Sequence, residues 1–398
     1  MSESVALVAI ALPRPAAARA VVAAWEAGEA VLPLDPGAPA PELKGTLAAA
    51  RPTHLLDGEG RRRLPGGEPA EAGLAAVLAT SGTSGTPKVV ELGADAVRWS
   101  ALATSRALAA GPGDRWLCCL PLHRVAGLAV VARAWHTGLP VEVHERFDPS
   151  AVRAGAGQAT LVSLVPAMLR RLLAAGDEAA RFRRVLLGGG PVPADLVAEA
   201  ARRGVGLVRT YGLTETFGGM VHDGHPLDGA EVRVGDPEGE VLVRGPMLFR
   251  RYRGDPDRTA AVLGGGWLRT SDLGRLDPGG RLVVLGRSDD LVISGGVNVH
   301  PEEVEAVLAT HPGVAEAAVA GRPDPEWGQR VAAFVVPRDP AHPPTLAELR
   351  AFARERLAPA KAPRELGLVA ELPRSASGKL LRRLLPDGES HMDGRPWA

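Results

Sequence analysis

The chain of 398 residues has little of what would place it in several broad classes of protein. Its two cysteines, Cys118 and Cys119, are adjacent in "RWLCCLPLH". Neighbours on one strand point to opposite faces, so we expect no disulfide between them and interpret both as core residues. The 46 basic and 46 acidic residues cancel. This balance argues against a general nucleic-acid binder, because such proteins normally carry a basic excess.

Long apolar runs are also missing from the sequence. No uninterrupted run reaches the length of about 18 residues that a membrane-spanning helix needs. The N-terminal "MSESVALVAIAL" has no basic segment before its short apolar run, unlike a signal peptide. We therefore expect a cytoplasmic protein with neither a membrane span nor a nucleic-acid partner. The sequence does have 45% hydrophobic residues, enough for a large core, and a length that favours one large and one small domain.

The order of apolar runs along the chain predicts the fold class. Between about residues 20 and 230, strand-like runs alternate with helical stretches, which predicts an α/β layered domain with largely parallel sheets and ligands at the carboxyl ends of the strands. From 230 to 290, short β runs between Gly-rich turns predict a small antiparallel subdomain. A β-α-β-β-α order after residue 290 predicts a compact α+β unit of roughly 100 residues.

One loop, "ATSGTSGTPKVV" (79–90), lies between two strand-like runs and concentrates hydroxyls, glycines and a lysine. Gly82 and Gly85 let consecutive N–H groups gather on one concave face, which suits a phosphate. The candidate phosphate-binding residues are Thr80, Ser81, Gly82, Thr83, Ser84, Gly85, Thr86 and Lys88. A Ser/Gly linker is the alternative. The nucleotide-binding P-loop pattern fails, because Thr86 and Pro87 separate Gly85 from Lys88 and no helix start follows.

Two further loops follow strand-like runs. "LLGGGPVP" (186–193) carries Gly188, Gly189 and Gly190, which would let the backbone approach a flat ligand closely; a plain Gly-Pro turn is the alternative. "RTYGLTETFGG" (209–219) follows the strand "VGLV" and reads as a turn. Its tyrosine has the chemistry to stack on a base, its threonine to donate to a phosphate and its glutamate to bind Mg²⁺, with a surface turn as the alternative.

Two segments near the end of the chain add charged candidates. Asp272 and Arg287 fall on opposite sides of a predicted hairpin, where Asp272 has the chemistry to accept both hydroxyls of a ribose and Arg287 to donate to one. A solvated Asp and a salt-bridging Arg are the alternatives. "PRSASGKLLRR" (373–383) carries a lysine on a Ser-rich loop, and taken alone it would be a solvated basic tail.

Five segments occur in a characteristic order and spacing: "SGTSGTPK", "YGLTE", "GWLRTSDLG", "GRSDD" and "PRSASGK". With them the chain resembles, from about residue 75 to 383, the adenylate-forming superfamily of acyl-CoA synthetases, luciferases and peptide-synthetase adenylation domains. Within it, "HRVAGLAVVARAW" and "YGLTETFGGMVHDGHPLDGAEVRV" are similar to the o-succinylbenzoate–CoA ligases of menaquinone biosynthesis, particularly the compact actinobacterial form. The resemblance implies an AMP-forming acid–thiol ligase that uses ATP, Mg²⁺, coenzyme A and an aromatic carboxylic acid.

The resemblance also implies domains and residue roles. An AMP-binding adenylation domain would span 1–286, a hinge 287–289 with Asp289 at its centre, and a small mobile domain 290–385. The 80–88 loop would cradle the β,γ-phosphates, Gly188 to Gly190 would line the adenine, and Tyr211 with Gly212 would lie against its face. The remaining roles fall to Thr214 (α-phosphate), Glu215 (Mg²⁺), Asp272 and Arg287 (ribose), Lys379 (catalytic lysine of the first half-reaction), and Gly295 and Gly296 (channel for the pantetheine arm of CoA).

The acid-binding pocket is predicted from the substrate's second carboxylate and keto group, which need a donor or cation. Arg133 and His123 are the candidates, with Arg124 third, and a structural His123 is the alternative; Gly218 and Gly219 would shape the aromatic end. The loop at residue 80 begins on the order of 100 residues earlier than in full-length relatives, so we expect part of the usual N-terminal subdomain to be absent. Ser271 replaces a common Gly, which should be tolerated if its φ is negative.

Two other functions stay open at this point. One is another adenylate-forming enzyme, either an aryl- or fatty acyl-CoA ligase or an adenylation enzyme that loads a carrier protein, since all share the ATP-binding segments. The other is a catalytically silent scaffold on the same fold, which the presence of Lys88, Glu215, Asp272, Arg287 and Lys379 together argues against. Assembly into a homo-oligomer is not decided by the sequence.

Overall fold

The computed structural model describes residues 4–80, 87–235, 239–374 and 380–386. The chain divides into two compact units, the first comprising Met1–Val192, Leu196–Arg233 and Leu242–Arg269, and the second Pro193–Asp195, Val234–Val241 and Thr270–Ala398. The predicted fold class, a large α/β part followed by a small α+β part, is confirmed. The hinge expected at 287–289 stays a prediction.

The helices begin and end where capping chemistry allows. Asp148 and Asp255 accept hydrogen bonds from the first turns of their helices, Thr345 and Glu348 form a capping box, and Gly138 ends its helix in the left-handed conformation. The α-helices of the described residues are α1 Arg14–Glu26, α2 Ala40–Ala50, α3 Ala94–Ala107, α4 Val125–Thr137, α5 Pro149–Gly155, α6 Pro166–Ala175, α7 Ala194–Arg202, α8 Pro256–Val262, α9 Pro301–Leu308 and α10 Leu346–Arg354.

One seven-stranded sheet of the first unit holds the predicted phosphate loop between two of its strands. Its strand order is β18 Arg251–Tyr252, β8 Lys88–Gly93, β7 Leu74–Thr80, β3 Ala30–Pro33, β2 Leu7–Ile10, β4 His54–Asp57 and β5 Gly60–Arg63. The central strands β4, β2, β3 and β7 are parallel, and β8 and β18 add antiparallel at one side. Buried apolar residues of β2, β3 and β7 pack against α2 and form one core. A separate two-stranded antiparallel sheet is formed by β1 Ser4–Val5 and β6 Ala70–Glu71.

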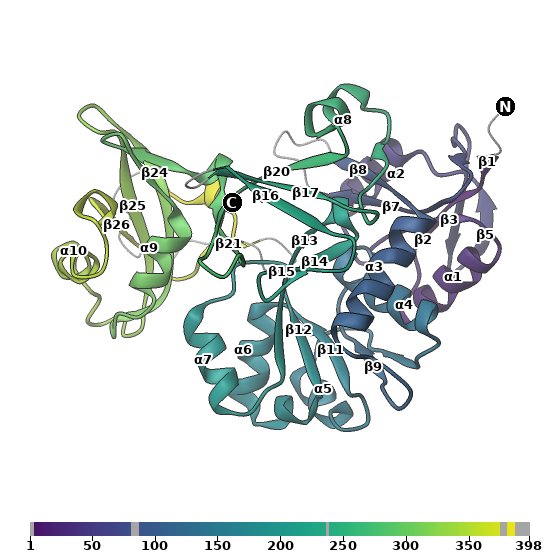
Figure 1. Cartoon of the computed structure of the whole chain (residues 1–398), viewed down its shortest axis with the longest axis horizontal. Helices are drawn as coiled ribbons and strands as arrows, with labels where there is room; N and C mark the ends of the chain where they lie inside the picture. Colours follow the sequence, from purple (N-terminus) through teal and green to yellow (C-terminus); the bar gives the residue numbers. More distant parts are fainter. Residues whose placement is uncertain (1–3, 81–86, 236–238, 375–379, 387–398) are drawn as a thin grey trace. The chain divides into compact units, whose positions relative to one another are not determined.

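A second seven-stranded sheet is parallel for most of its width. Its order is β10 Val141–Val143, β9 Trp116–Cys118, β11 Leu161–Leu164, β12 Arg184–Leu187, β13 Leu207–Leu213, β14 Gly218–His222 and β15 His225–Pro226. Helices α5, α6 and α7 pack their apolar residues on β9, β11 and β12, and α4 packs against α3 (Figure 1). Because a parallel sheet needs both faces covered, this arrangement explains the continuous apolar runs of these strands.

The prediction of a turn at 209–219 is wrong for the first half of the segment. Tyr211 and Gly212 belong to β13, which pairs parallel with β12 and antiparallel with β14, and only 214–216 form a short 3-10 turn. The local signal from Gly and Thr suggested a turn, but antiparallel pairing with β14 extends the strand through Leu213, beyond Arg209, where its pairing with β12 ends. The candidate site residues of this segment therefore start on a sheet rather than on a free loop.

The remaining strands form two smaller sheets. One has the order β16 Glu231–Val234, β17 Gly239–Arg244, β20 Trp267–Leu276 and β19 Leu263–Gly264, with β21 Leu282–Arg287 also paired to β20, and so confirms the predicted antiparallel region. The other, in the second unit, has the order β23 Val297–Val299, β22 Val292–Ser294, β25 Gly328–Pro337 and β24 Val314–Asp324, with β26 Glu365–Leu368 beside β25. Helices α9 and α10 cover its buried apolar face.

We expected Ser271 to be tolerated in place of a glycine if its φ were negative. Its φ is instead +58°, in the left-handed region. A non-glycine residue carries strain there. Its backbone N–H donates to Oε1 of Glu240 at 3.0 Å, so the neighbouring strand holds the peptide in this conformation. The glycine expected at this position in relatives therefore has a conformational reason.

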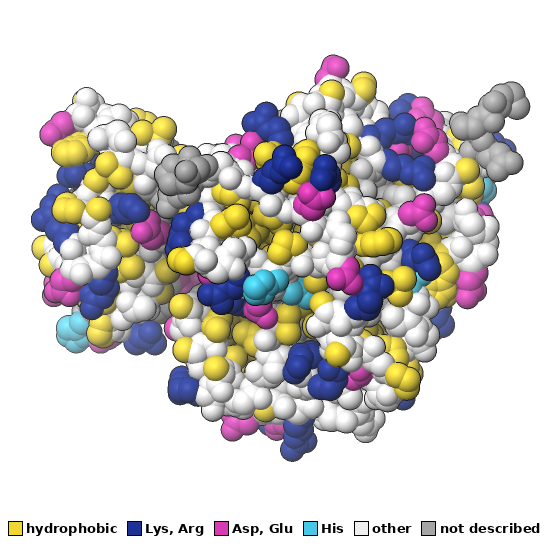
Figure 2. All heavy atoms as spheres, viewed as in Figure 1, with side chains coloured by type: hydrophobic (Ala, Val, Ile, Leu, Met, Phe, Trp, Pro, Cys, Tyr) yellow, Lys and Arg dark blue, Asp and Glu magenta, His cyan; other side chains and the backbone are white. Residues whose placement is uncertain are grey.

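Composition and structure agree on two further points. Cys118 and Cys119 are both fully buried free thiols, as predicted. On the face shown in Figure 2, basic and acidic side chains are interspersed rather than gathered into one patch of a single sign. Among the helices of the described residues, none combines the length and the hydropathy needed to cross a bilayer.

Candidate active site

The ends of the predicted phosphate loop are fixed by strand pairing. Thr80, the last residue of β7, is the register partner of Lys88, the first residue of β8. The segment between them therefore connects two strands, as the sequence predicted, and the structure adds that these strands are antiparallel. Ser81, Gly82, Thr83, Ser84, Gly85 and Thr86 lie outside the described residues.

Glu215 is held by a tyrosine that sequence reasoning did not single out. The hydroxyl of Tyr252 donates to Oε1 of Glu215 at 2.7 Å, and the backbone N–H of Phe249 donates to the carbonyl of Glu215, also at 2.7 Å. Nζ of Lys88 lies 5.8 Å from the centroid of the Tyr252 ring, within the range of a cation–π interaction. The carboxylate and the lysine therefore meet at one aromatic ring that is itself only 4% exposed.

The chemistry of this carboxylate fits a magnesium ion that is shared with a phosphate. In proteins Mg²⁺ is commonly bound by one or two carboxylates, with substrate phosphates and water completing the shell. Glu215 is such a carboxylate: one oxygen is engaged by Tyr252, and no ion pair of the described residues involves it. The described residues also contain no cluster of three or more His, Cys, Asp or Glu side chains arranged as a metal site.

Arg133 is a buried cation with polar company. Its Nη1 donates to Oγ of Ser163 on β11 at 3.3 Å, and the guanidinium lies 5.4 Å from the Trp116 ring centroid. Burial lowers the pKa of Arg133 to about 10, so it stays charged at neutral pH. Within the described chain no carboxylate pairs with it, and its Nε has no hydrogen-bond partner. A buried unpaired cation is costly, which suggests a site for an anion.

Residues of β13 and β14 lie beside this arginine. Burial lowers the pKa of His222 to about 4, and the charge of Arg133 contributes to the shift, so His222 is neutral at pH 7. Both ring nitrogens of His222 and the hydroxyl of Thr210 are buried without a partner. A Cβ on Gly219 would fall 3.5 Å from His222 Nε2, and one on Gly218 would lie 3.8 Å from Ala129 of α4. The structure thus brings Gly218 and Gly219 together with the helix that carries Arg133.

His123 lies in the loop between β9 and α4 and is half-buried. Burial lowers its pKa to about 4, with Arg124 contributing in the same direction. At neutral pH it is therefore a neutral imidazole, which can donate a hydrogen bond but supplies no positive charge. Of the two first candidates for a carboxylate site, Arg133 alone is a cation.

The glycines at the carboxyl ends of β12 and β13 have packing reasons of their own. A Cβ on Gly188 would meet Cγ2 of Thr210 at 2.6 Å, and one on Gly212 would meet the carbonyl of Gly218 at 1.8 Å. Gly189 has φ +81°, whereas Gly190 is exposed with open space around it. Close backbone packing, rather than a ligand alone, thus requires Gly188 and Gly212.

In the second unit, Asp272 and Arg287 are register partners on β20 and β21, as predicted. Nη1 of Arg287 donates to Oδ1 of Asp272 at 3.0 Å and to the carbonyl of Thr270 at 3.1 Å. Burial and the charge of Asp272 act on Arg287 in opposite directions, and its pKa is raised overall. Asp272 is 6% exposed and so is not the solvated residue of the alternative reading. Asp289 lies 3.7 Å from Nη2 of Arg287 and is largely exposed.

Gly295 and Gly296 form the turn between β22 and β23, with φ +59° and +77°. A Cβ on Gly295 would meet the Trp327 ring at 2.5 Å, so both conformation and contact require glycine at this position. Lys379 lies outside the described residues; the chain on either side of it is joined by a bridge between Arg374 and Leu380.

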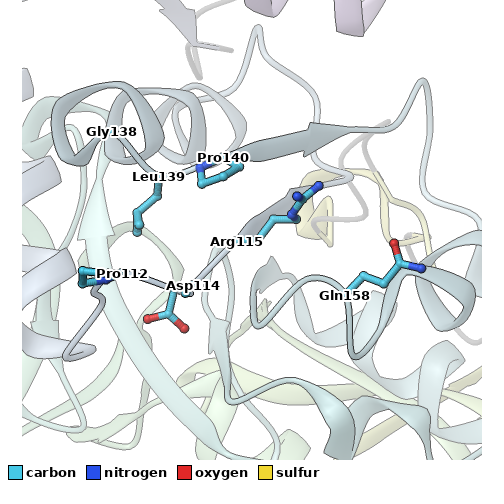
Figure 3. Close-up of a pocket in the computed structure, with 8 residues that line it drawn as sticks. Pro112, Asp114, Arg115, Gly138, Leu139, Pro140 and Gln158 are labelled. Carbon is cyan, nitrogen blue, oxygen red and sulfur yellow. The ribbon is translucent and has the colours of Figure 1, made fainter.

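A pocket of about 400 Å³ opens elsewhere on the first unit (Figure 3). It is lined by Pro112, Gly113, Asp114, Arg115, Gly138, Leu139, Pro140 and Gln158. These residues precede β9, β10 and β11, so the pocket lies at the amino ends of parallel strands, the edge opposite the candidate site. Asp114 is already bonded to Arg183 and Thr160, and its pKa is lowered by these partners against the effect of burial.

The sequence reasoning missed Tyr252, Ser163, Thr210 and His222. Tyr252 sits in "FRRYRGD" without a glycine or hydroxyl cluster to mark it, and only strand pairing brings it to Glu215. The one signal that could have marked Tyr252 is that the chain has only two tyrosines.

With this geometry in place, the class of protein follows. A family model described as AMP-binding enzyme matches residues 57–253, and one described as AMP-binding enzyme C-terminal domain matches residues 303–379. The chain belongs to the AMP-binding enzyme family.

Several similar proteins carry the name of one enzyme. The chain is 41% identical over 337 residues to a 2-succinylbenzoate–CoA ligase of Geobacillus kaustophilus, covering 78% of this chain and 69% of the relative. It is 44% identical over 334 residues to a Mycobacterium tuberculosis protein named "Probable 2-succinylbenzoate–CoA ligase", covering 80% and 85%. It matches the structure of o-succinylbenzoate CoA synthetase from Bacillus subtilis in complex with its acyl-adenylate intermediate with a TM-score of 0.86 and 32% identity, over 97% of this chain and 89% of that one.

Proposed function

We propose that this protein is a 2-succinylbenzoate–CoA ligase: it activates the acid with ATP as an acyl-adenylate and transfers the acyl group to the thiol of CoA. The observation that carries the proposal is the junction of Lys88, Tyr252 and Glu215, which joins the end of the predicted phosphate loop to a carboxylate suited to Mg²⁺. The relatives named 2-succinylbenzoate–CoA ligase, and the Bacillus subtilis synthetase solved with ATP and magnesium ion, support it.

In the first step a substrate carboxylate oxygen attacks the α-phosphorus of ATP, the P–O bond to the β-phosphate breaks, and pyrophosphate leaves. Negative charge spreads over the phosphates, so the reaction needs cations and N–H donors rather than an enzyme nucleophile. Lys88 and the 80–86 segment would receive the β,γ-phosphates, Thr214 would donate to the α-phosphate, and Glu215 would hold Mg²⁺. Bound Mg²⁺ would offset part of the phosphate charge.

The adenosine contacts are proposed residue by residue. Tyr211, Gly212 and the 188–190 glycines would border the adenine, and Asp272 would accept from the ribose hydroxyls. The ion pair between Asp272 and Arg287 supports this role, because it fixes the carboxylate on a strand before the ligand arrives.

In the second step the sulfur of CoA attacks the acyl carbon, the acyl–phosphate bond breaks and AMP leaves. Lys379 would serve the first step only, so we propose that rotation at Asp289 exchanges it for the 295–296 turn, whose glycines leave room for the pantetheine arm. The proposed domains are 1–286 and 290–385.

Arg133 is proposed to bind the second carboxylate of the acid. Three observations support it: the guanidinium is charged, it has no acidic partner in the described chain, and Gly218 lies near the same helix. Neutral His123 would contribute a hydrogen-bond donor at the acyl end.

The test is pyrophosphate release from ATP and Mg²⁺ with a panel of acids (2-succinylbenzoate, benzoate, medium-chain fatty acids and amino acids), each with and without CoA. We expect the fastest release with 2-succinylbenzoate and a CoA thioester as product. Faster release with another acid would keep the adenylation chemistry and reject the substrate assignment. No release with any acid would reject the ligase.

A further inference from the structure

No motif in the sequence singles out Tyr252 as a candidate site residue. It lies on β18, which pairs with β8 so that Tyr252 is opposite Val90, two residues after Lys88. Its backbone N–H donates to Oγ1 of Thr259 at 3.0 Å, and its ring packs 4.9 Å, centroid to centroid, from the ring of Phe249. With 4% exposure the side chain is held on several sides, so its hydroxyl is a rigid donor.

The hydroxyl meets Glu215 from a direction that selects one oxygen. Tyr252 donates to Oε1 at 2.7 Å, while the backbone of Glu215 is fixed separately by the N–H of Phe249 at 2.7 Å. A glutamate side chain otherwise rotates about its last torsion, which is broad. Because the backbone and Oε1 of Glu215 are both held, the position of Oε2 is fixed as well.

We propose that Tyr252 is a positioning residue for the magnesium-binding carboxylate: its hydroxyl orients Glu215, and its ring, beneath Nζ of Lys88, fixes the distance between the metal ligand and the phosphate-binding lysine. This inference rests on the proposed function, because it needs Glu215 and Lys88 to act on ATP. Partners that orient a metal ligand typically affect metal affinity or activity by about 10–100-fold.

The residues on the opposite face of the same strand explain why a hydroxyl, and not a cation, orients Glu215. Arg251 and Arg253, the neighbours of Tyr252, both bond Glu91 on β8. Alternation along the strand sends the tyrosine the other way. A neutral donor orients Glu215 without cancelling the charge that a metal ion requires, whereas an arginine there would compete with the ion.

The first measurement is ATP binding by calorimetry with and without Mg²⁺. For Tyr252→Phe we expect the Mg²⁺-dependent gain in ATP affinity to fall by about 10–100-fold, with metal-free ATP binding unchanged. The Mg²⁺ concentration for half-maximal pyrophosphate release should rise by a similar factor, and saturating Mg²⁺ should restore most of the rate. Phe182→Leu, which changes a buried aromatic ring in the core of α5, α6 and α7, is the control and should keep the wild-type Mg²⁺ dependence.

A second readout uses the fact that the chain contains two tyrosines. Labelling with 3-fluorotyrosine gives two ¹⁹F resonances, which Tyr252→Phe and Tyr211→Phe assign. Adding Mg²⁺ to the ATP complex should shift the Tyr252 resonance. Unchanged Mg²⁺ dependence in Tyr252→Phe, or equal losses in Phe182→Leu, would overturn the proposal. If wild-type protein itself showed no Mg²⁺-dependent ATP binding, the proposed function would fail instead.

Discussion

Two glutamates on either side of one strand have opposite surroundings. Glu91 on β8 is 1% exposed and is bonded by Arg251 at 2.8 Å and by Arg253 at 2.8 Å, and Arg253 is itself nearly buried. Glu215 receives a hydrogen bond from Tyr252 and forms no ion pair with the described residues. Arg251, Tyr252 and Arg253 are consecutive, so one short segment satisfies both carboxylates.

The difference shows that a buried carboxylate can serve stability or ligand binding, depending on whether its partners neutralise its charge. A carboxylate neutralised by two guanidiniums has no charge left for a ligand, and its network ties β18 to β8. Nε of Arg253 also donates to the carbonyl of Ala50, which extends the network to the end of α2. A carboxylate held by a phenol is oriented but keeps its charge. We therefore expect Glu91 to govern stability and Glu215 to govern catalysis.

The largest expected effect comes from breaking the structural side of this comparison. Glu91→Gln leaves the buried guanidinium of Arg253 without its counter-charge, which should lower the free energy of unfolding by about 3–5 kcal/mol. Urea denaturation followed by circular dichroism measures it. Activity per folded molecule at low temperature should remain close to wild type; a loss of activity without loss of stability would contradict the assignment.

Glu215→Gln tests the chemical side. The amide retains an oxygen for the Tyr252 hydroxyl, so the free energy of unfolding should change by less than about 0.5 kcal/mol. The loss of negative charge should lower the rate of pyrophosphate formation by about 10²–10³-fold. Stopped-flow or coupled assays of pyrophosphate measure the rate. Destabilisation comparable to that of Glu91→Gln would show that the two carboxylates do not differ as described.

Arg133 extends the comparison from anions to cations, since it is a buried guanidinium that no described carboxylate neutralises. Arg133→Met should raise KM for 2-succinylbenzoate by about 10–100-fold, the size expected for a lost charged hydrogen bond, and should change KM for benzoate little. Initial rates with both acids give the ratio. Arg124→Met serves as the control; equal effects on both acids, or a larger ratio in the control, would reject the role of Arg133.

The smallest effect concerns a histidine that is buried without charge. The pKa of His222 falls from its ordinary 6.5 to about 4, so the folded state binds fewer protons than the unfolded chain between these values. Its contribution to stability is present above pH 6.5 and is lost as pH falls toward 4. His222→Asn should flatten the pH dependence of the melting temperature in this window. Its exposed register partner provides the control, since His225→Asn should leave the slope unchanged.

The predicted placement of residues in the fold was right where chain order was enough, and the roles of these residues stay predictions. Asp272 and Arg287 pair across a hairpin, as predicted, because β20 and β21 are near neighbours in sequence. A connection between two strands at 81–86 was predicted too, whereas the antiparallel pairing of Thr80 with Lys88 was not. The turn predicted at 209–219 failed in its first half because antiparallel pairing with β14, the next strand along the chain, outweighed a glycine and a threonine. Ser271 differed for a long-range reason: its N–H donates to Glu240, thirty-one residues away in sequence, and this contact holds the peptide at positive φ.

The sequence by itself determined the class of fold and the order of the two parts, and it named the candidates for phosphate, ribose and metal binding, whose roles stay predictions. Alternating apolar runs and glycine-rich turns are local properties, and five collinear motifs need no structure to be recognised. Only the tertiary structure decided that Tyr252 holds Glu215, that Arg251 and Arg253 hold Glu91, and that Arg133 lies charged beside Ser163. Each of these pairs is at least 30 residues apart in sequence, and their meeting depends on which strands become neighbours in a sheet.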